Sequence, residues 1–151
     1  MIQTKKNEIC FYGYDGKNNN YYLSFYDTQE RKIINKIDKT DSICCFTMIP
    51  KNLLIAGTNE KLLIINVNSH NIIREINSSG SSYIYTMCMI NENQLLTGDS
   101  NRKIKQWKIE GDNLILISTK ENAHNKEIYI ILKIGDNHIL TGDYSGEEKI
   151  W

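Results

Sequence analysis

The chain repeats itself at an interval of 41 to 44 residues, and this period constrains its fold more than any other feature. A glycine follows an apolar run at four places: Gly13, Gly57, Gly98 and Gly142. Residues that we read as turn positions stand five places before these glycines: Glu8, Asn52, Asn93 and Asn137. Isoleucine recurs fourteen residues before the last three glycines. Because several positions repeat together, the period favours a fold built from similar supersecondary units.

The composition of each unit predicts short β-strands rather than helices. Runs rich in Ile, Leu and Tyr are separated by Asn, Asp and Gly, and Pro50 is the single proline. Such runs favour strands between tight turns, and sustained 3.6-residue apolar periodicity is missing. The predicted strands are 9–13, 22–26 and 32–37 in the first unit, 43–48, 53–57, 61–66 and 72–76 in the second, 84–89, 94–98, 103–107 and 114–118 in the third, and 128–133, 138–142 and 148–151 in the fourth.

The two ends of the chain fall inside units. The opening strand of the first unit would lie mostly before Met1, and the fourth unit reaches Trp151 after three strands. We therefore expect one partial domain, residues 1–151, that begins within one unit and ends within another. Its units are approximately 1–37, 38–76, 77–118 and 119–151.

The last two units carry a recognisable motif. The fourth reads Ala123-His124, then Ile139-Leu140-Thr141-Gly142-Asp143, then Lys149-Ile150-Trp151, and the third reads Leu95-Leu96-Thr97-Gly98-Asp99, then Ile104-Lys105-Gln106-Trp107. In these segments the chain resembles the WD-repeat β-propellers of the G-protein-β type. The resemblance implies an all-β fold, a partial propeller of about three and a half four-stranded antiparallel blades.

The resemblance also implies structural roles for individual side chains. Members of this family often link a loop His, a strand Ser or Thr, a turn Asp and a strand Trp within one blade. His124, Thr141 and Trp151 match three of these positions, while Ser145 stands where the family has Asp. The third unit keeps Thr97 and Trp107. Glu148 occupies a strand position that is usually apolar.

Charge and cysteine content argue against several functional classes. Eighteen basic and eighteen acidic residues give zero net charge, which argues against a mainly electrostatic grip on nucleic acid or acidic lipid. No apolar run approaches membrane-spanning length, and no secretory signal precedes the repeats. The four cysteines, Cys10, Cys44, Cys45 and Cys88, form neither a zinc motif nor a disulfide framework. An intracellular setting is expected, cytoplasmic in preference to nuclear.

Candidate catalytic and metal-binding groups are better explained by the repeat. His70 is expected to cap a surface turn, His138 to open a strand, and His124 to staple a blade. Asp99 and Asp143 invite a paired-carboxylate interpretation, but they share one repeat register, and an active site breaks such symmetry. Nucleophile elbows and phosphate-binding loops do not occur. We expect no catalytic residue, no metal and no cofactor.

The loops at one end of the array are the candidate binding surface. They carry exposed-looking charged and aromatic residues that suit protein recognition: Lys39, Asp41, Tyr83, Lys126, Glu127 and Tyr144. The sequence thus favours a non-catalytic protein-interaction scaffold with a protein or peptide partner, part of a larger protein or assembly. The rest of the propeller would come from the same gene or a second copy of the chain. The alternative is a catalytic or small-ligand-binding propeller of hydrolase or lectin type.

Overall fold

A computed structural model of the chain describes residues 1–39, 41–78 and 80–151. Every regular element among these residues is a β-strand, so the all-β prediction is confirmed. The described residues include no helix that is long and apolar enough to cross a membrane.

The strands form four antiparallel sheets, each built from consecutive strands in chain order. The first sheet contains β1 (Ile2–Lys5), β2 (Glu8–Asp15), β3 (Asn20–Asp27) and β4 (Lys32–Lys39). The second contains β5 (Cys45–Ile49), β6 (Leu53–Gly57), β7 (Lys61–Asn66) and β8 (Asn71–Asn77). The third contains β9 (Ile84–Asn91), β10 (Gln94–Asp99), β11 (Ile104–Glu110) and β12 (Asn113–Lys120). The fourth is three-stranded and contains β13 (Ile128–Ile134), β14 (His138–Asp143) and β15 (Glu148–Ile150).

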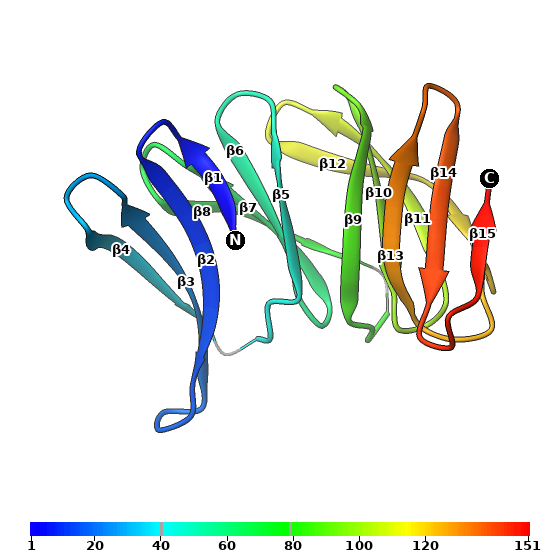
Figure 1. Cartoon of the computed structure of the whole chain (residues 1–151), viewed down its shortest axis with the longest axis horizontal. Coiled ribbons are helices and arrows are strands. Elements are labelled where there is room, and N and C mark those ends of the chain that lie inside the picture. Colours follow the sequence, from blue (N-terminus) through cyan, green and yellow to red (C-terminus); the bar gives the residue numbers. More distant parts are fainter. Residues whose placement is uncertain (40, 79) are drawn as a thin grey trace.

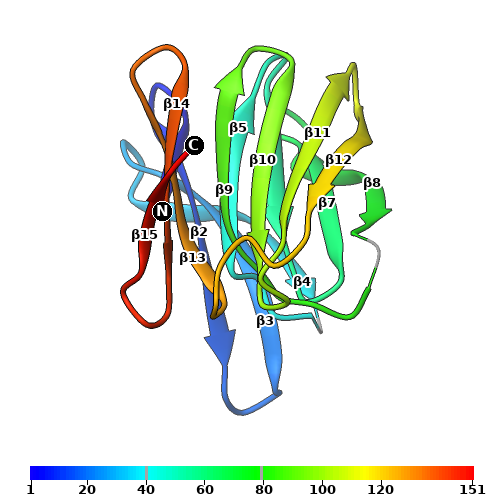
Figure 2. The same cartoon turned by 90° about the vertical axis from the view of Figure 1, so that its right-hand side faces the viewer.

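The sheets stand side by side in chain order and pack face to face (Figures 1 and 2). Their first strands are neighbours, since β5 contacts β1 and β9, and β9 contacts β13. Sheets one and four lie at opposite ends of the row. A separate apolar cluster fills each junction between neighbouring sheets.

The continuous apolar runs of the second sheet follow from its place between two neighbours. In β6, Leu54 and Ala56 pack toward the first sheet, while Leu53 and Ile55 pack toward the third. All five residues of β6 are buried. A strand that is covered on both faces loses the polar alternation of a half-exposed strand, which explains why it reads as an uninterrupted apolar run.

The repeated glycines mark places where the next sheet approaches closely. A Cβ atom at Gly57 would lie 3.0 Å from the Ile84 side chain, and one at Gly98 would lie 2.7 Å from Ile128. Ile84 and Ile128 begin the first strands of the following sheets. Gly142 holds the same register in the fourth sheet, where a Cβ atom would meet nothing closer than 3.6 Å.

The repeat register predicted for the first unit was wrong by one residue. The Asn52 carbonyl accepts from Val67 N–H at 3.0 Å, and the Asn93 carbonyl accepts from Ile109 N–H at 2.8 Å. In the first sheet the same bond runs from Thr28 N–H to the Asn7 carbonyl at 2.8 Å, so Asn7 is the turn residue and Glu8 begins β2. The residue of the first sheet that is equivalent to Gly57 and Gly98 is therefore Tyr12.

Gly13 has a local explanation instead of a repeat role. A Cβ atom there would lie 2.5 Å from the Tyr22 ring of the neighbouring strand. Tyr12, in the glycine register, packs edge-on against Phe46 of the second sheet at 5.7 Å between ring centroids. The first sheet therefore has room for an aromatic ring at the repeat position that is glycine in the second and third sheets.

The opening strand of the first unit is also present within the chain, contrary to the prediction. β1 pairs with β2 through Ile2 opposite Cys10 and Gln3 opposite Ile9. The strand is short and mostly polar, so it lacks the apolar run that identifies the other strands. The first sheet is therefore four-stranded.

Candidate functional site

Loops from several sheets gather at one end of the row, the lower end in Figure 1. They are the links between sheets, which enter β5, β9 and β13, together with the hairpin loops after β2, β6, β10 and β14. Hydrogen bonds join the two kinds of loop within a repeat, since Ser100 N–H donates to the Tyr83 carbonyl and Tyr144 N–H donates to the Glu127 carbonyl, both at 2.9 Å. We call this set of loops the interaction rim.

The residues predicted for the rim differ in how far their side chains are exposed. Tyr144 is 74% exposed and Tyr83 is 43% exposed, and Lys126 is also exposed. Glu127 and Asp41 are half-buried. The predicted set also includes Lys39, whose side chain lies outside the described residues. The structure brings Tyr83, Lys126, Glu127 and Tyr144 together on the third and fourth sheets.

Four tyrosines form a continuous row across this part of the rim. The Tyr85 and Tyr129 rings stack at 4.4 Å between centroids and 10° between planes. Tyr83 lies parallel to Tyr85 at 5.8 Å, and Tyr144 lies tilted against Tyr129 at 5.8 Å. We call Tyr83, Tyr85, Tyr129 and Tyr144 the tyrosine row.

Of these four residues, only Tyr83 and Tyr144 were predicted from the sequence. The signal for its centre was available, because Tyr85 and Tyr129 each directly follow a repeat isoleucine and stand 44 residues apart. The second unit has Cys44 directly after its repeat isoleucine, Ile43. The aromatic register is thus shared by the third and fourth units alone.

The Tyr85 hydroxyl, at the centre of the row, remains protonated at neutral pH. Burial raises the pKa of Tyr85 to about 12, and a hydrogen bond with Tyr129 acts in the same direction. A phenol in that state can both donate and accept hydrogen bonds, so the row offers polar groups along an aromatic surface.

Asp143 fixes the rim loop that carries Tyr144. Its Oδ1 accepts from Ser145 N–H at 2.9 Å, from the Ser145 hydroxyl at 2.7 Å and from Glu147 N–H at 3.1 Å. Its Oδ2 accepts from Lys126 N–H at 3.0 Å. Burial raises the pKa of Asp143, but these hydrogen bonds outweigh burial and hold that pKa below its usual value. The carboxylate therefore serves as a loop anchor.

Asp99 anchors the equivalent loop of the third sheet. Its Oδ1 accepts from Asn101 N–H and Lys103 N–H, both at 3.0 Å. Its Oδ2 lies 3.3 Å from Lys105 Nζ and accepts from the Ser82 hydroxyl at 3.4 Å. Asp99 and Asp143 therefore repeat one structural role on separate loops.

The matched family positions of the fourth sheet form a hydrogen-bonded chain. His124 Nε2 lies 2.6 Å from Thr141 Oγ1, which also accepts from Trp151 Nε1–H at 2.8 Å. In the third sheet, Trp107 Nε1–H donates to Thr97 Oγ1 at 3.0 Å. Because both tryptophans bond to a threonine of the neighbouring strand, these contacts hold β10 to β11 and β14 to β15.

A set of candidate metal ligands lies beside this hydrogen-bonded network. His124, Asp143 and Glu147 offer ligand atoms within 4.8 Å of one another, and buried His124 Nδ1 makes no hydrogen bond. The carboxylates of Asp143 and Glu147, however, already have polar or charged partners. Asp143 accepts four hydrogen bonds, and Lys149 Nζ lies 3.5 Å from Glu147 Oε2. We assign these residues a structural role.

The surface-turn prediction for His70 was incomplete. His70 does occupy a turn, with φ of 55°, but its Nε2 lies 2.9 Å from Glu8 Oε2. The Thr4 hydroxyl donates to Glu8 Oε1 at 2.7 Å, and the His70 ring packs on Phe25 at 4.3 Å. The side chain therefore joins the first and second sheets.

The Glu8 cluster predicts a loss of stability in acid. Burial raises the pKa of Glu8, but hydrogen bonds from Thr4 and His70 and the charges of His70 and Lys5 outweigh it and lower the pKa. Since the folded state holds the proton less tightly, the stabilisation is present above the unfolded pKa and is lost as pH falls through the folded value. The free energies of unfolding of the wild type and Glu8→Gln, measured in urea at pH 3 to 7, should differ above about pH 4.5 and converge below it. Glu148→Gln, at an exposed carboxylate, is the control, and a gap that widens in acid would contradict the prediction.

The cysteines are free and carry no indication of reactivity. Burial raises the pKa of Cys10 to about 12 and raises the pKa of Cys45 further still. A thiol nucleophile needs the opposite shift, because the thiolate is the reactive form.

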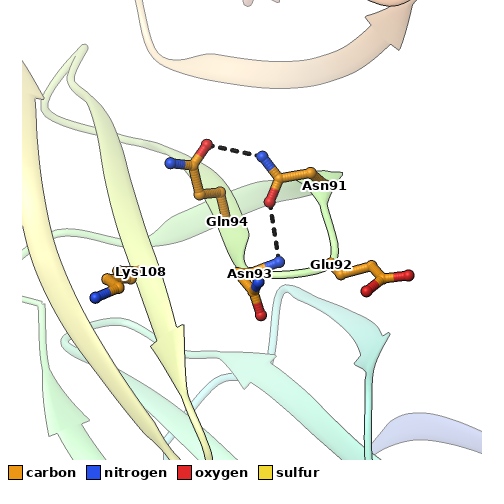
Figure 3. A pocket seen from close by; sticks show the side chains of 5 residues that line it. All are labelled: Asn91, Glu92, Asn93, Gln94 and Lys108. Carbon is orange, nitrogen blue, oxygen red and sulfur yellow. Dashed lines mark hydrogen bonds between the residues drawn. The ribbon is translucent and has the colours of Figure 1, made fainter.

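An open hollow at the opposite end of the sheets is lined by polar residues, three of which hydrogen-bond to one another (Figure 3). Asn91 Nδ2–H donates to Gln94 Oε1, and Asn93 N–H donates to Asn91 Oδ1, both at 2.9 Å. These bonds close the β9–β10 turn. The hollow is a by-product of that turn, and we do not assign it a ligand.

No protein-family model and no curated protein matches the chain.

Proposed function

We propose that the chain is a WD-repeat-type propeller segment that acts as a non-catalytic scaffold and binds a protein or peptide at the interaction rim. The observation that carries this proposal is the tyrosine row. Its exposed ends, Tyr83 and Tyr144, lie on loops held by the buried carboxylates Asp99 and Asp143, and its centre lies on β9 and β13. Tyrosine supplies a large contact area at small entropic cost, and it is enriched among the residues that dominate binding energies.

The order of the sheets supports the propeller assignment. Three four-stranded sheets and one three-stranded sheet stand side by side, and their first strands line one side of the row, as blades do around an axis. The bond from Trp107 to Thr97 recurs from Trp151 to Thr141, and this repetition supports the assignment. A hydrolase or lectin-type propeller would need polar groups that converge between the first strands. In β9, Met87 and Cys88 pack against the apolar clusters on either side, and Thr86 Oγ1 already accepts from Ile131 N–H at 3.2 Å.

We further propose that another sheet covers the free face of the fourth sheet. The exposed apolar side chains on it are Ile130, Leu132, Ile134 and Ile150. Ile130 lies opposite Gly142, Leu132 and Ile150 lie on either side of Leu140, and Ile134 lies opposite His138. A contiguous apolar patch of this kind is typical of an interaction surface. The covering sheet would come from the rest of the same protein or from a second copy.

Removing the ends of the tyrosine row should strongly weaken partner capture. We expect the double variant Tyr83→Ala/Tyr144→Ala to capture about tenfold less of each specific partner, or less still. Truncating an aromatic hot spot commonly reduces the binding free energy by more than about 1.4 kcal/mol. Affinity capture with quantitative mass spectrometry would measure this loss.

The matched control for this experiment is Ile117→Ala, an exposed apolar residue on β12 outside the rim. It should leave the partner set unchanged. Identical partner sets for the wild type and the double variant would argue against recognition through the rim.

A further inference from the structure

The outer strand of the third sheet has an open backbone edge. Among the residues that the structure describes, β12 is hydrogen-bonded to β11 on one side and to no strand on the other, and it lies at the far edge of the sheet from β9 (Figure 2). β4 and β8 hold the same outer position in the first and second sheets. Such an edge presents N–H and C=O groups that can accept a further strand.

β12 lacks the charges that the other two outer strands carry along their length. β4 contains Lys32, Lys36 and Asp38, and β8 contains Arg74 and Glu75 at its centre. β12 is charged only at its last residue, and four apolar residues follow one another at 114–117. Charged residues on an edge oppose the addition of another strand. Of the three outer strands, β12 is therefore the one suited to strand addition.

The apolar residues of β12 are also accessible to a second strand. Ile115 is 42% exposed, Leu116 is 39% exposed and Ile117 is 48% exposed. A bulge interrupts the pairing of all three outer strands at equivalent points, so it does not set β12 apart. An added strand would cover these side chains as well as pair with the backbone, and both contributions favour its binding.

We propose that β12 pairs antiparallel with β12 of a second copy of the chain, so that two third sheets join into one continuous sheet. A two-fold axis perpendicular to the sheet makes the paired strands antiparallel and brings the same edge of both copies together. The proposal is independent of the interaction rim.

The charges at the two ends of β12 fit a second copy in particular. Asp112 directly precedes the strand and Lys120 ends it, and both are exposed. The two residues are equally far from Leu116. With Leu116 on the two-fold axis, Asp112 of each copy lies opposite Lys120 of the other, and Ile115 lies opposite Ile117. Opposite charges stabilise a cross-strand pair, whereas like charges destabilise it.

The present contacts of these two side chains are compatible with such a pair. Asp112 lies 3.5 Å from Arg74 in an exposed contact, and Lys120 Nζ lies 5.4 Å from the centroid of the Trp151 ring. The tyrosine row would stay uncovered, because the centre of the row lies on β9 and β13, and β9 is the opposite edge of the third sheet. The paired chains would therefore present two tyrosine rows, which strengthens binding to a partner with two linked binding segments.

Sedimentation of the full chain at concentrations up to about 0.1 mM tests the proposal. We expect the wild type to form a dimer and Ile115→Lys to weaken dimer formation by about tenfold or more, because a charged edge opposes strand addition. The matched control is Ile73→Lys on β8, where Ile73 is 41% exposed, and it should dimerise as the wild type does. Assembly through the free face of the fourth sheet would be insensitive to Ile115→Lys, so this variant separates the two modes of association.

Disulfide cross-linking tests the register. Residues directly opposite each other in antiparallel strands have Cα atoms about 4.5–5.5 Å apart, a separation that a disulfide can span. Under mild oxidation, Leu116→Cys should give more covalent dimer on a non-reducing gel than the wild type, whose four native cysteines set the background. Ile73→Cys should stay at that background. A monomer at every concentration, equal dimerisation of Ile115→Lys and the wild type, or equal cross-linking of Leu116→Cys and Ile73→Cys would overturn the proposal.

Discussion

Replacing Asp99 with alanine is expected to lower the free energy of unfolding by about 3–5 kcal/mol. The Asp99 side chain is 2% exposed and lies 3.3 Å from Lys105 Nζ, itself on a side chain that is 3% exposed. Removing one member of a buried ion pair leaves the charge of the other without its carboxylate in a medium of low polarity. The loop bonds from Asn101 and Lys103 would be lost as well.

Urea unfolding monitored by tryptophan fluorescence would measure this change, since Trp107 lies in the same sheet. The matched control is Asp112→Ala, which removes an exposed carboxylate 3.5 Å from Arg74 and should cost less than about 1 kcal/mol. The double variant Asp99→Ala/Lys105→Met should recover part of the loss, because it also removes the buried charge that the Asp99 carboxylate balances. Similar losses for Asp99→Ala and Asp112→Ala would contradict the buried-pair explanation.

The sequence was sufficient to place strands wherever apolar runs end in turn residues. Strands predicted at 53–57 and 61–66 coincide with β6 and β7, because Asn, Gly and Lys bound both runs. β1 was missed since it pairs mainly through its backbone and has no apolar run of its own. Gly13 was misassigned because a glycine required by Tyr22 stands one residue from the true repeat position.

Contacts between sheets could not be read from the sequence in the same way. His70 and Glu8 are 62 residues apart, and their meeting depends on how the second sheet leans on the first. The tyrosine row shows the same limit. The period places Tyr85 and Tyr129 in one register, but ring stacking depends on the distance and angle between β9 and β13. Repeat arithmetic thus predicts which residues are equivalent, and packing decides which of them touch.

Replacing Gly98 with valine is expected to destabilise the chain by about 2–3 kcal/mol. Valine favours strands, so any loss must come from packing against neighbouring side chains. Its Cβ atom would lie 2.7 Å from Ile128 Cγ2 and 2.9 Å from Thr86 Cγ2, and its two methyl groups would extend further into this space. The third and fourth sheets would have to separate. Urea unfolding of the variant measures the cost.

Gly142→Val supplies the matched control because Gly142 holds the same register on the free face. Its nearest neighbour for a Cβ atom is Ile130 at 3.6 Å, an ordinary contact, so stability of the isolated chain should change by less than about 1 kcal/mol. If another sheet covers this face as Ile128 covers Gly98, the same variant should weaken assembly, seen as a lower mass in concentration-dependent sedimentation. Equal stability losses at the two glycines would refute the packing argument. Assembly that tolerates Gly142→Val would mean that the free face is not covered in the way the other sheets are.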